Sequence, residues 1–83
     1  MSYSTITIAE KLGMHISVIE NYEEEWVAEN VGLPEPDESF EEFLCRTFAE
    51  CAFLMTATEG EGNAMECLEA YDEAYSDVEE ILA

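Results

Sequence analysis

Apolar residues recur every three or four positions in the C-terminal half of the chain, a spacing that places them on one face of a helix. Ser39 begins the sequence SFEE, in which the serine caps a helix start and Glu42 bonds back to the cap. The apolar positions continue to Met55, and the segment CAFLM (51–55) is apolar nearly all round, which predicts a buried central helix. The glycines of EGEGN (59–63) predict the end of this helix and a turn.

A second periodic segment follows, and the capping pattern NAME (63–66) opens it. Its apolar face consists of Met65, Leu68, Tyr71, Tyr75, Val78 and Leu82. Its other face consists of Glu66, Glu69, Glu73, Asp77 and Glu80. Like charges at this spacing each destabilise an isolated helix by a few tenths of a kcal/mol, about the size of a favourable pair. Packing of the apolar face must therefore hold this helix in place.

The N-terminal half allows two interpretations. The patterns TIAE (7–10) and SVIE (17–20) predict two short helices separated by a turn at Gly13, with the second helix running to about Asn30. The alternations TITI (5–8) and HISV (15–18) instead fit a β-hairpin.

After the second of these helices, residues 31–36 form a linker, because Pro34 and Pro36 cannot continue a helix. The length of 83 residues predicts a single domain, 1–83. One fold class is an all-α bundle of about four helices with a helix-turn-helix-like N-terminus. The other is an α+β fold with a β-hairpin over residues 4–19, packed on three helices.

Charge narrows the classes of partner. Asp and Glu number 21 against two Lys and Arg, so the net charge is −19, while 48% hydrophobic and 11% aromatic residues are enough for a core. A chain of this sign lacks the usual attraction to nucleic acid and to anionic membranes. The composition therefore predicts neither direct nucleic-acid binding nor membrane binding, and favours a basic protein surface as the partner.

The spacing of Ala9, Gly13 and Ile19 is that of a helix-turn-helix, and residues 8–26, IAEKLGMHISVIENYEEEW, resemble the start of MerR-type regulators. In that family the second helix enters the DNA major groove. The positions that would lie nearest DNA are His15, Ser17, Glu20, Asn21 and Glu24. Two of them are carboxylates and none is Arg or Lys, so the resemblance implies the shape of the motif without DNA reading.

Signatures of catalysis are missing from the sequence. His15 is the single histidine, and the glycines at 60 and 62 lack the lysine of a phosphate loop. Cys45, Cys51 and Cys67 form no CxxC pair, and the first two are expected to be buried in the helix that they share. We therefore expect no enzyme activity, no cofactor and no metal. The absence of a basic, apolar leader and the cysteine usage favour the cytoplasm.

In size and charge the chain resembles acidic DNA-mimic inhibitors of phages and plasmids, the antirestriction and anti-CRISPR class. The resemblance implies a protein that blocks the nucleic-acid-binding surface of a host defence protein, such as a CRISPR-Cas complex or a restriction enzyme, in the bacterial cytoplasm. The alternative is an acidic adaptor or modulator that docks a basic partner protein without imitating DNA. The predicted partner-binding residues are Glu20, Glu23, Glu24, Trp26, Glu66, Glu69, Asp72, Glu73, Asp77 and Glu80.

Overall fold

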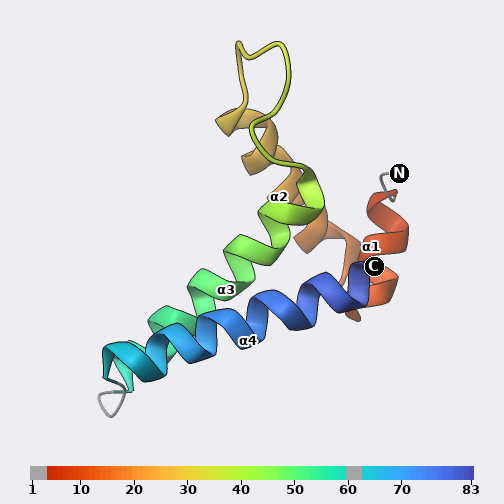
Figure 1. Cartoon of the computed structure of the whole chain (residues 1–83). Helices are drawn as coiled ribbons and strands as arrows, with labels where there is room; N and C mark the ends of the chain where they lie inside the picture. The colour runs from red at the N-terminus through yellow and green to blue at the C-terminus, as the bar shows by residue number, and fades with distance from the viewer. Residues whose placement is uncertain (1–3, 60–62) are drawn as a thin grey trace.

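The computed structural model describes residues 4–59 and 63–83 and is all-α within them (Figure 1). Its helices are α1 (Thr5–Leu12), α2 (Ile16–Glu29), α3 (Phe40–Thr58) and α4 (Ala64–Leu82). The prediction of a four-helix bundle is confirmed, and the alternative hairpin over residues 4–19 is wrong. A strand would place Ile6 and Ile8 on one face, but Ile8 is fully buried while Ile6 is 58% exposed, as a helix requires.

The turn between α1 and α2 is closed by Gly13. Its φ of 67° is left-handed, and its N–H bonds to the carbonyls of Ala9 and Glu10. The caps differ from the predicted ones. The Ser4 hydroxyl accepts from the Thr7 N–H at 3.2 Å, and His15 Nδ1 accepts from the Ser17 N–H at 3.1 Å. Both helices thus begin two or more residues earlier than the patterns at 7–10 and 17–20 predicted.

The predicted starts of α3 and α4 are confirmed. Ser39 Oγ accepts a hydrogen bond from the Glu42 N–H at 3.1 Å, and Asn63 Oδ1 accepts one from the Glu66 N–H at 2.9 Å. Each bond satisfies a backbone donor that a helix start would otherwise leave unpaired. The glycine turn predicted after α3 falls on residues 60–62, which lie outside the described residues.

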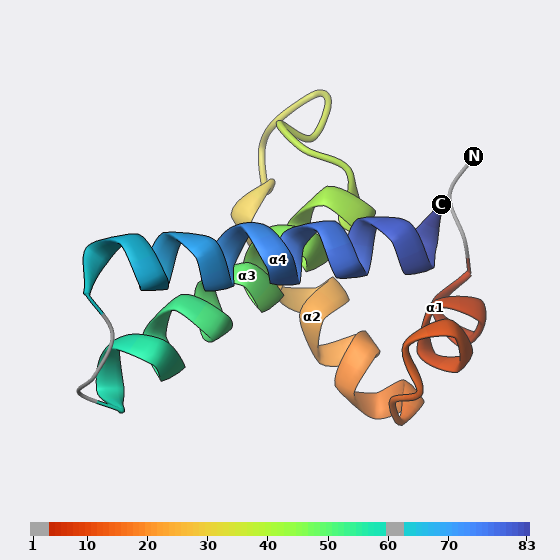
Figure 2. The ribbon, with the colours of Figure 1, turned by 60° about the horizontal axis from the view of Figure 1, so that its bottom comes forward.

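The helices α3 and α4 pack antiparallel along most of their length, and the α1–α2 pair covers one end of them (Figures 1 and 2). α1 contacts α2 and α4, and α2 contacts α3, whereas α2 and α4 do not contact each other. Ile8, Ile19, Phe43 and Leu44 are the largest fully buried side chains. The core therefore lies where all the described helices meet.

The C-terminal half of α3 is less covered than the sequence predicted. Within residues 51–55, Cys51 is exposed, and Leu54 and Met55 are 62% and 63% exposed. The expectation of a buried central helix at this point is wrong, and so is that of a buried Cys51, although Cys45 is buried as expected. The reason is that the joined ends of α3 and α4 extend beyond α1 and α2, so this segment has α4 as its helical neighbour (Figure 1).

Candidate protein-docking surfaces

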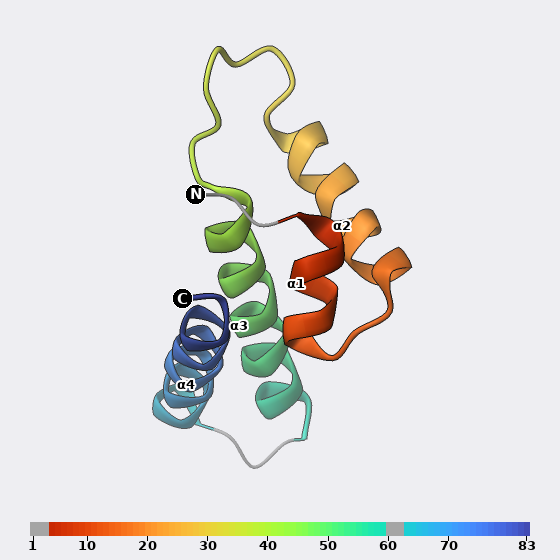
Figure 3. The ribbon, with the colours of Figure 1, turned by 90° about the vertical axis from the view of Figure 1, so that its right-hand side faces the viewer.

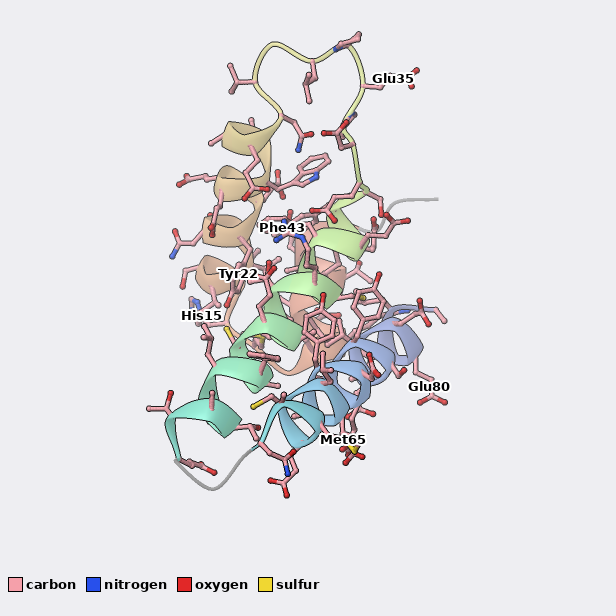
Figure 4. All side chains as sticks on the ribbon, turned by 60° about the vertical axis from the view of Figure 1, so that its left-hand side comes forward. His15, Tyr22, Glu35, Phe43, Met65 and Glu80 are labelled. Atoms are coloured by element: carbon pink, nitrogen blue, oxygen red, sulfur yellow. The ribbon has the colours of Figure 1, made fainter. Side chains whose placement is uncertain are left out.

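A continuous row of carboxylates follows the outer face of α4. Its members are Glu66, Glu69, Glu73, Asp77 and Glu80, and all are exposed. They lie opposite the buried side chains of Cys67, Val78 and Leu82. At about 1.5 Å per residue the row is roughly 21 Å long. Figure 2 shows α4 running across the front of the molecule, and Figure 4 shows Glu80 extending away from its helix. We call these five residues the α4 acidic row.

A separate group of carboxylates lies on α2. Glu20 and Glu24 are exposed, whereas Glu23 is partly buried and accepts a hydrogen bond from the Thr5 hydroxyl at 2.5 Å. Together with Thr5 and Val27 they line a shallow groove between α1 and α2. One of the three predicted carboxylates is thus partly engaged in holding α1 against α2.

The predicted residues therefore divide into two surfaces. α2 and α4 do not contact each other, and α1 and α3 lie between them in the view along α4 (Figure 3). The carboxylates of α2 and the α4 acidic row consequently do not form one charged face. Asp72, which was predicted with the row, lies beside it on α4 and is exposed.

Trp26 is partly buried and packs inside the fold. Its Nε1–H donates to the carbonyl of Glu38 at 3.0 Å, and its ring centre lies 5.7 Å from that of Phe40. It thereby holds the linker against α2. It also borders a groove of about 630 Å³, whose acidic wall consists of Glu23, Glu35, Asp37, Glu38, Glu41 and Glu42. The sequence pattern placed Glu35 in a linker and Glu41 and Glu42 in a helix cap, and it gave no sign of this groove.

Arg46 lies at the centre of a cluster of carboxylates. Its guanidinium bonds to Glu38 at 2.8 Å, to Glu50 at 3.0 Å and to Glu29 at 3.3 Å, and it lies over the Phe43 ring, 5.2 Å from its centre. Hydrogen bonds to Glu38 and then to Glu50 raise the pKa of Arg46 above its ordinary value. Arg46 therefore joins the end of α2, the linker and α3.

An apolar groove lies between the exposed half of α3 and the first half of α4. It measures about 420 Å³, and Glu50, Phe53, Leu54, Leu68 and Tyr71 line it. Leu54 and Leu68 are 62% and 57% exposed. We call it the α3–α4 groove. The three-four spacing predicted Leu68 on the packed face of its helix, because a periodic stripe does not show where the neighbouring helix stops covering it.

Carboxylates continue along the same α3–α4 seam toward the core. Burial is the main cause that raises the pKa of the Cys45 thiol, and the charges of Glu79 and Glu42 raise it further. Burial also raises the pKa of the Tyr75 phenol, and the charges of Cys45, Glu42 and Glu79 add to the effect. Glu42 on α3 and Glu79 on α4 therefore lie close enough to this seam to act on groups within it.

The residues with helix-turn-helix spacing lie around the turn between α1 and α2. Ala9 and Ile19 are buried and Gly13 is left-handed. Glu20, Asn21 and Glu24 are exposed on α2. His15, which corresponds to a DNA-facing position, instead uses Nδ1 to cap its own helix. The segment thus consists of two short helices joined at a left-handed glycine, with acidic side chains on its outer surface.

Comparison of the chain with protein-family models, with characterised proteins and with solved structures finds no match. No helix among the described residues is long and apolar enough to cross a membrane. Across residues 4–59 and 63–83, no group of three or more His, Cys, Asp or Glu side chains is arranged to hold a metal ion. The described residues define the class: a strongly acidic protein of four helices, with carboxylates on α2, on α4 and around the groove beside Trp26, and with an exposed apolar groove.

Proposed function

We propose that this protein is an acidic inhibitor that mimics DNA and blocks the nucleic-acid-binding surface of a host defence protein, such as a CRISPR-Cas complex or a restriction enzyme. The main observation behind the proposal is the α4 acidic row, whose five carboxylates are all exposed on a single helix. A rigid helix holds its carboxylates in place before the partner arrives, so binding need not order them.

The charge density of α4 supports this comparison with DNA. Asp72 and Glu79 flank the row, and the resulting seven carboxylates lie within roughly 21 Å of helix. That is about one charge per 3 Å, against one phosphate per about 3.4 Å along a single DNA strand. Arg and Lys side chains in a nucleic-acid groove would therefore meet a similar density of negative charge.

The experiment is a pull-down from bacterial lysate with immobilised protein, followed by elution with duplex DNA or with salt. Glu69→Lys with Glu73→Lys reverses two charges in the row. Glu20→Lys with Glu24→Lys changes the net charge by the same amount on α2 and serves as the matched control. We expect a DNA-binding protein that duplex DNA displaces, with its capture reduced about tenfold by the α4 variant and less by the control.

Unchanged capture by the α4 variant would mean that the partner does not bind at the α4 acidic row. Equal losses in both variants would show that net charge alone retains the partner, without a defined face. A partner that holds on at high salt and ignores DNA would replace mimicry with the second candidate, an adaptor or modulator. The α3–α4 groove favours that candidate, because DNA has no apolar surface of this kind to imitate.

A further inference from the structure

The α3–α4 groove combines an apolar floor with acidic borders. Phe53, Leu54, Leu68 and Tyr71 form the apolar part, and Glu50 lies in the wall on the α3 side. On α4, exposed Asp72 follows Tyr71 directly and lies one helical turn from Leu68. The groove is thus bordered by a carboxylate from each helix, Glu50 on α3 and Asp72 on α4.

These charges determine which occupant fits the groove. A second copy of the chain would bring another −19 charge against the same borders, and that repulsion opposes self-association. A peptide with acidic flanks is disfavoured for the same reason. A basic segment is attracted instead, and apolar side chains on it would find exposed Leu54 and Leu68.

The shape favours a helix as that segment. Two antiparallel helices leave a seam between them, and the side-chain ridges of a third helix can pack into such a seam. Helices that bind in this way present apolar anchors every three or four residues and charged residues beside them. An extended strand would gain no backbone hydrogen bonds in the groove, because α3 and α4 use their interior donors and acceptors within the helices.

We propose that the α3–α4 groove binds an amphipathic helix of a partner protein, with apolar side chains seated on Phe53, Leu54, Leu68 and Tyr71 and Lys or Arg side chains facing the acidic borders. This goes beyond DNA mimicry and does not depend on it. The α4 acidic row supplies a salt-sensitive attraction, whereas the groove adds contact that salt does not screen.

The test uses synthetic peptides and no DNA, so its outcome is independent of the proposed function. One labelled peptide of about 18 residues places Leu at helical three-four spacing with Lys elsewhere, long enough to form a helix when bound. A second has the same composition in shuffled order, and a third replaces Lys by Glu. Fluorescence anisotropy measures binding at about 0.15 M and about 1 M salt.

We expect the amphipathic Lys peptide to bind at least about tenfold more tightly than the shuffled one at high salt, and the Glu peptide to bind weakly. Leu54→Ser with Leu68→Ser should abolish the tenfold preference. Val31→Ser with Leu33→Ser is the control, because those linker side chains are 75% and 46% exposed and lie outside the groove. Circular dichroism checks that each variant keeps its helices.

Equal binding of the amphipathic and shuffled peptides to the unmodified protein would overturn the proposal, and this measurement needs no variant to fold. If the variant at Leu54 and Leu68 still prefers the amphipathic peptide over the shuffled one, the peptide helix binds outside the α3–α4 groove. Tight binding of the Glu peptide would contradict the proposal that the acidic borders select a basic helix. A concentration-dependent dimer in sedimentation, lost in the same variant, would assign the groove to a second copy.

Discussion

The two halves of α3 both contain large apolar side chains but have different surroundings. In the N-terminal half, Phe43 is 1% exposed and Leu44 is fully buried, because α2 covers one side and α4 another. In the C-terminal half, Leu54 is 62% exposed. This half packs against α4 but is not covered by α2, which lies against the N-terminal half. An apolar side chain is thus buried only where another element reaches it. The comparison separates a half that stabilises the fold from a half that is available for binding.

The strongest test of this difference is Leu44→Ala against Leu54→Ala. Leu44→Ala should reduce the free energy of unfolding by about 2–5 kcal/mol, since it leaves a cavity in a fully buried site. Leu54→Ala should change it by less than about 0.5 kcal/mol. Urea denaturation followed by circular dichroism measures both.

A loss of this size can unfold a small, highly charged domain completely. The measurement is therefore repeated at high salt, which screens the repulsion within the −19 charge. Similar losses in the two variants would contradict the division of α3 into two halves.

Trp26→Phe tests how α2 and the linker hold the buried half. The variant keeps an aromatic ring beside Phe40 but loses the hydrogen bond to the Glu38 carbonyl. The expected loss is about 1 kcal/mol in the free energy of unfolding, measured by urea denaturation. An unchanged free energy would mean that the Trp26 bond adds nothing to the attachment of the linker.

The smallest expected effect appears in alkaline solution. Burial raises the pKa of Cys45 in the folded state, so above about pH 8.5 the unfolded chain loses this proton first. Unfolding then releases a proton, and stability falls as the pH rises. The free energy of unfolding is measured between about pH 7 and about pH 10, a range that brackets the ordinary thiol pKa of about 8.5. The slope of this free energy against pH is the quantity compared.

Cys45→Ala should flatten that slope, and Cys51→Ala is the matched control because its side chain is exposed on the other half of α3. The same slope in Cys45→Ala as in the unmodified protein would mean that Cys45 does not carry the effect. The raised pKa values of Tyr22 and Tyr75, due first to burial, leave a residual slope in both variants.

Part of the candidate site could be predicted from the sequence. The α4 acidic row follows from three-four spacing, and its exposure opposite Cys67 and Val78 agrees with that spacing. The groove beside Trp26 could not be predicted, because it joins α2, the linker and α3. Of the Arg46 partners, only Glu50 lies at the local i,i+4 spacing, whereas Glu38 and Glu29 are 8 and 17 positions away. No local pattern shows that these two distant glutamates meet Arg46.

The sequence by itself determined the two C-terminal helices, because their signals are local, and it left the N-terminal half open between two helices and a hairpin. Ser39 and Asn63 bond to backbone donors three residues away, and Gly13 adopts a left-handed φ that other residues disfavour. The tertiary structure alone decided that the C-terminal half of α3 is exposed and that the acids of α2 and α4 lie on separate surfaces. Whether a side chain is buried, and whether two groups of carboxylates share one surface, depends on which helices pack together. Contacts between residues far apart in the chain decide how the helices pack.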